Sequence, residues 1–164
     1  MINKIIFGAG CFWGVEHAFS LVPGVVSVKS GYSGGEEESA SYKEVCSGTT
    51  KHIEAVLVEY DDSVTLEQLL SIFWNIHDPT QLARQGNDLG TQYQSAIFYY
   101  TNDQFEIIEA SKNELKQSEL VTTIIKEAPP FYDAEEYHQK YLMKNPTGYC
   151  HINFALVKEL IAKL

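Results

Sequence analysis

The chain has 164 residues, a length that favours one domain with a core of its own. Its net charge of −10, from 12 Lys and Arg against 22 Asp and Glu, argues against binding to nucleic acid or to an anionic membrane surface. The apolar start of the chain is too short for a signal peptide, and no run approaches the ~20 apolar residues of a membrane span, so we expect a cytoplasmic protein. Its 3 cysteines form no Cys-x-x-Cys pair and its histidines lie in no metal-binding motif, so no metal site is expected.

The hydrophobic pattern predicts strands and helices that alternate along the chain. In the first half it predicts a strand over 2–8, a helix over 13–22, and strands over 25–30 and 52–60. A helix follows Thr65 and Gln68, which match a capping box, and a long ordered loop spans 78–92. In the second half the pattern predicts strands over 93–100 and 120–126, and helices over 102–117, 134–142 and 154–163.

The order of these elements defines the expected fold. The sequence β-α-β-β-α-β-α-β contains a split βαβ unit, which predicts an α+β sandwich of the ferredoxin-like type. Beyond Pro129 and Pro130 the pattern becomes irregular, so we expect an irregular C-terminal segment. Residues 1–164 contain no internal repeat or linker, and we expect a single domain.

Cys11 lies at the break between the first strand and the first helix, within Gly-Ala-Gly-Cys-Phe-Trp-Gly over 8–14. The glycines permit a sharp turn, so Cys11 falls at the start of the helix, where free N–H groups and the helix dipole stabilise a thiolate. This position predicts a nucleophilic cysteine with a lowered pKa. An inert core thiol is the alternative, because buried cysteines are common.

Glu54 lies within an alternating strand, on the same face as Val56, Val58 and Tyr60. If that face is buried, desolvation raises the pKa of the carboxyl group, which then holds a proton at neutral pH. The alternative is a solvated carboxylate at the frayed start of the strand.

Gly-Cys-Phe-Trp-Gly-Val-Glu at 10–16 is the first of several distinctive segments. The others lie at 31–35, 42–48, 52–56, 77–80, 84–93, 131–135 and 145–150. Together, and in this order, they resemble the A-type peptide-methionine sulfoxide reductases over almost the whole chain.

The resemblance implies thiol-dependent reduction of methionine-S-sulfoxide, free or in peptides, without a bound cofactor. Cys11 would attack the sulfoxide sulfur, while Glu54 protonates the oxygen. Tyr42 and Tyr93 match the tyrosines whose hydroxyl groups hold that oxygen. Cys150 matches the resolving cysteine, which would form a disulfide with Cys11 for reduction by thioredoxin. From the residues alone, Cys150 could equally be a buried thiol.

Three further residues match substrate-binding positions of the family. Phe12 and Trp13 would form the walls that receive the S-methyl group, although they could be ordinary core aromatics. Asp88 matches a position close to the substrate, although an Asx-type turn is an alternative role. Cys46 lies in a block associated with structure, and we expect a buried thiol.

The sequence departs from the family pattern in three places. Residues 36–41 replace a proline-containing approach to Tyr42, and Lys51 replaces a glycine before His52. The tail from 154 has no second recycling cysteine, which predicts a relay of two cysteines. Two other functions compatible with a reactive cysteine are a thiol peroxidase and a non-catalytic redox sensor. A thiol peroxidase has no obvious use for the aromatic pair or the buried acid.

Overall fold

The structure is a computed structural model, and it describes residues 1–35, 45, 52–148 and 150–164. Its strands are β1 (Asn3–Gly8), β2 (Val25–Ser33), β3 (Ile53–Tyr60), β4 (Arg84–Gln85), β5 (Asp88–Leu89), β6 (Ala96–Tyr99), β7 (Ile124–Glu127) and β8 (Phe131–Asp133). Its α-helices are α1 (Phe12–Ser20), α3 (Leu66–Asn75), α4 (Asn102–Asn113), α5 (Tyr141–Lys144) and α6 (Phe154–Ala162). Short 3₁₀ helices are η1 (Thr91–Tyr93), η2 (Ser118–Leu120) and η3 (Glu136–His138). The predicted α+β class is confirmed.

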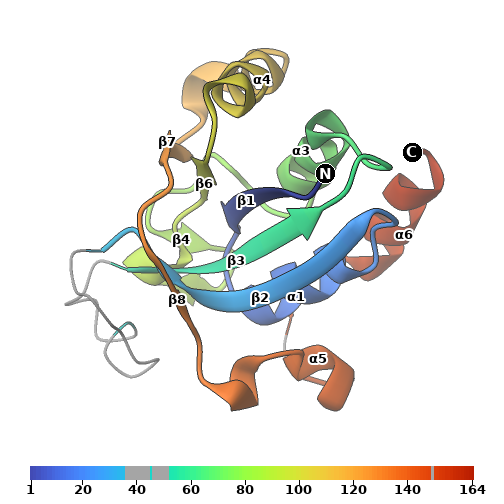
Figure 1. Cartoon of the computed structure of the whole chain (residues 1–164). Coiled ribbons are helices and arrows are strands. Elements are labelled where there is room, and N and C mark those ends of the chain that lie inside the picture. The colour runs from blue at the N-terminus through green and yellow to red at the C-terminus, as the bar shows by residue number, and fades with distance from the viewer. Residues whose placement is uncertain (36–44, 46–51, 149) are drawn as a thin grey trace.

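The main sheet is curled, and its strands lie in the order β7-β6-β1-β3-β2-β8 (Figure 1). Neighbouring strands are antiparallel except β6 and β7, which run parallel. Strand β3 therefore lies between β1 and β2, and its register with β2 places Glu54 opposite Tyr32. Strands β4 and β5 form a separate two-stranded pair within the loop that follows α3.

The main core lies between the sheet and the helices packed on one of its faces. Phe7 of β1 stacks on Phe19 of α1 and on Phe73 of α3, with ring centroids 4.8 and 4.9 Å apart. Such aromatic pairs contribute about 0.5–1.5 kcal/mol each beyond the area they bury. Other residues of this core are Ile5, Val15, Val56, Val58, Leu69, Leu70, Ile97, Ile108 and Val157.

The opposite face of the sheet carries a smaller core of Ile6, Ile53, Ala55, Ala96 and Phe98. Ala128, which precedes β8, and Phe131, the first residue of β8, pack against it. Both faces of β3 are therefore buried, which removes Glu54 from solvent although it lies near the start of its strand.

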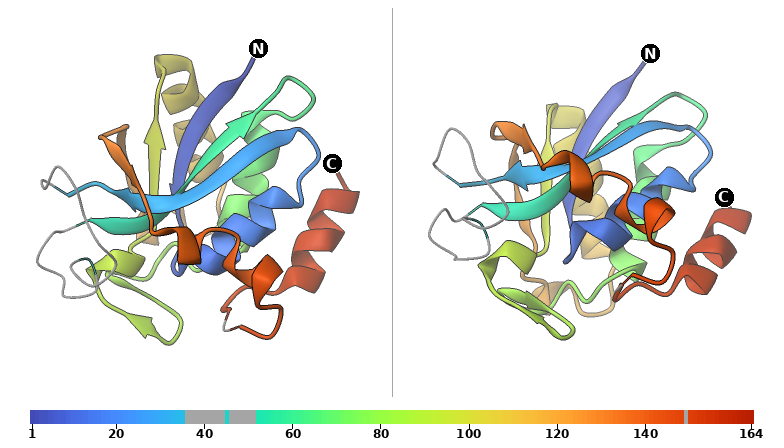
Figure 2. Two further views of the ribbon diagram at one scale, coloured as in Figure 1. Left: turned by 60° about the horizontal axis from the view of Figure 1, so that its bottom comes forward. Right: turned by 90° about the horizontal axis from the view of Figure 1, so that it is seen from below.

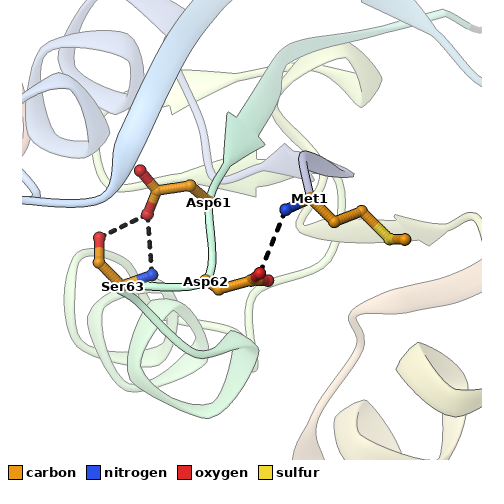
Figure 3. Close-up of polar contacts among 4 residues, drawn as sticks. All are labelled: Met1, Asp61, Asp62 and Ser63. Carbon is orange, nitrogen blue, oxygen red and sulfur yellow. Dashed lines mark hydrogen bonds and ion pairs between the residues drawn. The ribbon is translucent and has the colours of Figure 1, made fainter.

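The turn from β3 into α3 is fixed by local hydrogen bonds. Asp61 accepts hydrogen bonds from the backbone N–H and the hydroxyl group of Ser63, while Asp62 pairs with the N-terminal amine of Met1 (Figure 3). The predicted capping box is confirmed: the side chain of Thr65 accepts from the Gln68 N–H, and the Gln68 side chain accepts from the Thr65 N–H. These bonds satisfy N–H groups that the first turn of a helix otherwise leaves free.

The segment between β8 and α6 runs across α1 (Figure 2). It contains η3, then Lys140 in the left-handed region at φ 53°, then α5. The single helix predicted over 134–142 is therefore wrong, because the backbone turns at Lys140. The side chain of Glu16 in α1 and the backbone of Ser30 in β2, both distant in sequence, hold that turn.

Other predicted bounds differ by a few residues. The strand predicted over 93–100 begins only at Ala96, after η1, and the one predicted over 120–126 is Ile124–Glu127. The helix predicted over 102–117 ends at Asn113, and β8 was not predicted. Within the described ranges, no helix has the length and apolar character that a membrane span requires.

Candidate active site

The backbone between β1 and α1 holds Cys11 at the N-cap position of α1, as predicted. Gly10 adopts φ 95°, and a Cβ there would approach His151 Cε1 to 2.8 Å and Gln85 Cγ to 2.9 Å. A glycine is therefore required at this point for both backbone geometry and space. The thiol of Cys11 interacts with the backbone N–H of Trp13. Cys11 is only 8% exposed.

The protonation of Cys11 differs from the prediction made from the helix N-terminus. Burial raises the pKa of this thiol above its ordinary value, and the negative charges of Glu54 and Asp88 add to that increase. The Trp13 N–H acts in the opposite direction but does not outweigh burial. The expected lowering of the Cys11 pKa is therefore wrong, because desolvation exceeds the effect of the helix N-terminus.

Glu54 lies on the face of β3 that packs against α1, beside the start of that helix. Its carboxylate oxygen Oε1 accepts a hydrogen bond of 3.2 Å from the Phe12 N–H. Burial raises the pKa of Glu54 to about 8, although the Phe12 N–H lowers it. The carboxyl group is therefore mostly protonated at neutral pH. Val56, Val58 and Tyr60 are buried as well, which confirms the prediction that this face of the strand is buried.

Cys150 lies against the first turn of α1, although 138 residues separate it from Cys11 in sequence. A Cβ added at Gly14 would collide with Cys150 Sγ, so the absence of a side chain at Gly14 admits this thiol. Sγ also accepts a hydrogen bond of 3.2 Å from the Ile152 N–H. Both Cys11 and Cys150 are free thiols, and burial raises the pKa of Cys150.

Phe12 and Trp13 differ in exposure. Phe12 is fully buried, with its ring 5.7 Å from that of Tyr32 and 5.1 Å from that of His138. Trp13 is only partly buried, and its indole N–H donates a 2.9 Å hydrogen bond to His138 Nδ1. Its ring stacks on Tyr141 with centroids 3.7 Å apart and planes 11° from parallel.

Asp88 and Tyr93 come from the loop between α3 and β6. The charge of Asp88 raises the pKa of Cys11, Glu54 and Cys150, which places this carboxylate near all three groups. Tyr93 ends η1, which packs against β3, the strand of Glu54. Tyr42 and Cys46 lie outside the described residues.

Three residues around this site were not predicted from the sequence. His138 and Tyr141 contact Trp13, and Tyr32 lies beside both Phe12 and Glu54. Their partners are remote in sequence, so no local pattern distinguishes them from other aromatic residues. The strand predicted over 25–30 continues to Ser33 in the structure, and this extension places Tyr32 at a buried position of β2.

Two observations bear on other kinds of site. Among the described residues, no group of three or more His, Cys, Asp or Glu side chains is arranged to hold a metal ion. A cavity of about 730 Å³ lies between α1, β2 and residues 133–144; Trp13 lines it, but Cys11 and Glu54 do not. The cysteine site therefore lies outside this cavity.

A free thiol at a helix start, with a protonated carboxylic acid and a second thiol nearby, is the arrangement of a thiol-dependent oxidoreductase. Residues 3–163 match the sequence profile of the family described as peptide methionine sulfoxide reductase. The chain belongs to this family, and the resemblance found in its motifs is confirmed.

Individual proteins and solved structures of this family are similar to the chain over most of its length. It is 49% identical over 155 residues to the peptide methionine sulfoxide reductase MsrA of Clostridium botulinum (strain Loch Maree / Type A3), covering 93% of this chain and 99% of the relative. Crystallised Mxr1 from Saccharomyces cerevisiae in reduced form superposes with a TM-score of 0.87 at 39% identity, covering 93% of this chain and 91% of Mxr1. Mxr1 in complex with Trx2 gives a TM-score of 0.61 at 28% identity, covering 85% of this chain and 84% of that one.

Proposed function

We propose that this chain reduces methionine-S-sulfoxide to methionine, with Cys11 as the nucleophile. The observation that carries the proposal is the meeting of three groups at the start of α1. Cys11 occupies the N-cap position, Glu54 accepts a hydrogen bond from the Phe12 N–H, and Cys150 lies against Gly14. A nucleophile, a proton donor and a second thiol are what a two-electron reduction by cysteine requires.

The first step is activation of the thiol. The pKa of Glu54 is about 8 and burial places that of Cys11 higher, so above pH 8 the pair retains one proton. Because the pKa of Cys11 is the higher of the two, this proton resides mainly on Cys11, and the reactive form is the one in which it has passed to Glu54 and left Cys11 a thiolate.

The thiolate then attacks the sulfoxide sulfur, and Glu54 donates its proton to the oxygen. The oxygen passes to the sulfur of Cys11 as methionine leaves. Cys11 becomes a sulfenic acid: its sulfur gives up the two electrons that reduce the sulfoxide to methionine, so no bound cofactor is needed.

Substrate binding is assigned to residues around this centre. The partly buried indole of Trp13 supplies an apolar wall for the S-methyl group, and the buried ring of Phe12 supports it from the core. Asp88 lies near the reacting groups, where its carboxylate can accept a hydrogen bond from the substrate backbone. The hydroxyl groups of Tyr42 and Tyr93 are assigned to the sulfoxide oxygen, on the basis of the family motifs.

Cys150 closes the cycle. Its thiol attacks the sulfur of the Cys11 sulfenic acid, the S–S bond forms, and water leaves with the proton of Cys150. The contact of Cys150 with the first turn of α1 supports this pairing. A thioredoxin then reduces the disulfide; the complex of the relative Mxr1 with Trx2 supports such a partner.

Three broader proposals accompany this chemistry. The strand order β6-β1-β3-β2 with antiparallel neighbours supports a ferredoxin-like core, followed by an irregular C-terminal segment. The main core, which unites residues from β1 to α6, supports a single domain. A cycle that depends on free thiols fits a reducing compartment such as the cytoplasm.

Turnover with the two sulfoxide epimers tests the function. With dithiothreitol, the protein should reduce N-acetyl-methionine-S-sulfoxide and spare the R epimer, and Cys11→Ser should abolish the reaction. Residual turnover by Cys11→Ser would refute its assignment as the nucleophile. Rapid consumption of peroxide without sulfoxide reduction would indicate a thiol peroxidase, and oxidation of Cys11 without turnover would indicate a redox sensor.

A further inference from the structure

Glu16 is a buried carboxylate of α1 that the proposed chemistry does not use. It is 3% exposed, and its Oε1 accepts hydrogen bonds of 2.7 Å from the Lys140 N–H and 3.1 Å from the Ser30 hydroxyl group. Its Oε2 is buried with no hydrogen-bond partner among the described residues. Burying a carboxylate is costly unless it is hydrogen-bonded or paired, so the hydrogen bond from the C-terminal segment is important for Glu16.

The contact with Lys140 holds an unusual backbone conformation. Lys140 has φ 53°, in the left-handed region that side chains other than glycine rarely adopt. Gln139, next in sequence, is also anchored: its side chain accepts from the Ser30 N–H and donates to the Ser30 and Ala134 carbonyl oxygens. Glu16 and Ser30 therefore hold two consecutive residues of the segment between η3 and α5.

The residues on either side of this anchored pair fix Trp13. His138 accepts the hydrogen bond of the indole N–H, and Tyr141 stacks on the ring. The turn at Lys140 brings both partners onto the same indole. A change at that turn would move His138 and Tyr141 relative to each other, and Trp13 would lose its fixed orientation.

We propose that Glu16 is a positioning residue: by holding Lys140 in the left-handed conformation, it keeps His138 and Tyr141 on Trp13 and so preforms the wall for the substrate methyl group. This inference rests on the proposed function, which assigns Trp13 to substrate binding. Glu16 does not contact the reacting atoms in this account, and it acts through the backbone of Lys140.

The first test compares Glu16→Ala with Glu16→Gln, using N-acetyl-methionine-S-sulfoxide and dithiothreitol. Glutamine keeps an acceptor for the Lys140 N–H, and burial raises the pKa of Glu16, so a neutral amide is a close substitute. We expect Glu16→Ala to raise KM by about 10-fold with kcat changed by less than about 3-fold, and Glu16→Gln to stay within about 3-fold in both.

The second test is rescue through the backbone. Glycine adopts the left-handed conformation without steric cost, so Lys140→Gly should return the KM of Glu16→Ala to within about 3-fold of the natural protein. The matched control is Ala83→Gly, because Ala83 also has φ 53° but lies in the loop after α3. When Ala83→Gly is combined with Glu16→Ala, KM should stay raised.

A spectroscopic readout reports on Trp13 without reference to catalysis. The chain has two tryptophans, so a Trp74→Phe background leaves Trp13 as the sole indole fluorophore. Acrylamide quenching of this fluorescence should rise in Glu16→Ala and fall back when Lys140→Gly is added. If Glu16→Ala does not fold, Lys140→Val replaces it. Lys140 is exposed, so the substitution does not disturb the core, and a β-branched residue disfavours the left-handed conformation.

The outcomes separate this inference from the proposed function. The positioning role would be overturned if KM and quenching were unchanged in Glu16→Ala and Lys140→Val. It would also be overturned if Lys140→Gly failed to restore the KM of Glu16→Ala, or if Ala83→Gly restored it equally well. Full activity of Cys11→Ser would instead overturn the proposed function. In that case the quenching measurements would still decide whether Glu16 orients Trp13.

Discussion

Replacement of Glu54 by glutamine tests the proposed proton donor. Glutamine has nearly the same shape and can still accept the 3.2 Å hydrogen bond from the Phe12 N–H, so the start of α1 should be preserved. It carries no transferable proton. Because a positioned general acid contributes about 10²–10⁴-fold to rate, Glu54→Gln should lower kcat/KM by that amount.

The pH dependence provides a sharper result than the rate alone. In the free enzyme the pair of Cys11 and Glu54 must lose one of its two protons to reach the reactive state, and the pKa of Glu54 is about 8. The kcat/KM of the natural protein should therefore rise with pH up to about 8 and then level off. In Glu54→Gln this inflection should vanish, leaving a residual rate that follows ionisation of Cys11.

The same carboxyl group has a predictable effect on stability. Burial raises the pKa of Glu54 from 4.5 to about 8, so between these values the folded state holds a proton that the unfolded state has released. The free energy of unfolding should therefore fall as pH rises through this window, by a total on the order of 5 kcal/mol, and change little from this group above it. Glu54→Gln removes the loss, so the variant should gain stability relative to the natural protein between pH 5 and pH 9.

The assay measures kcat/KM for N-acetyl-methionine-S-sulfoxide with dithiothreitol between pH 5 and pH 10, with urea unfolding at both ends of the range. Glu67→Gln, on the exposed side of α3, is the matched control and should behave like the natural protein. If Glu54→Gln keeps kcat/KM within about 3-fold or retains the inflection near pH 8, the assignment of Glu54 as the acid is refuted.

Three further predictions concern recycling and stability. Cys150→Ser should release one methionine per protein molecule and then stop when thioredoxin is the only reductant; continued cycling would show that another thiol resolves. Gly14→Ala should slow thioredoxin-driven turnover more than the first turnover, because its methyl group would collide with Cys150 Sγ; equal effects on both, measured by quenched flow, would contradict this. Thr65→Ala should lower Tm by about 2–4 °C through loss of the capping box of α3, as measured by calorimetry, and an unchanged Tm would contradict it.

Local patterns in the sequence predict the elements that carry the site. The alternation of β3 correctly predicts a buried face for Glu54, and the glycines before Cys11 correctly predict its place at the start of α1. The protonation of Cys11 was not predictable in this way. The helix N-terminus is visible in sequence, but the burial that outweighs it comes from the packing of the whole fold.

The C-terminal segment shows why longer-range features escape sequence patterns. A helix over 134–142 is the natural local interpretation, yet Lys140 turns left-handed because Glu16 binds its N–H from a different helix. The proximity of Cys150 to α1 likewise depends on space left by Gly14, which no spacing rule contains. Family motifs bring Cys150 to attention, while the contact with Gly14 gives a physical basis for its pairing with Cys11.

The central claim is that Cys11 attacks the sulfoxide and Cys150 resolves the product. Mass spectrometry of the protein after one turnover on methionine-S-sulfoxide, without reductant, tests it most directly, because it identifies the disulfide. The account predicts one methionine released per molecule and a peptide pair joined through Cys11 and Cys150. A disulfide that joins Cys11 to Cys46, or a turnover that leaves Cys11 as a free thiol, would contradict it.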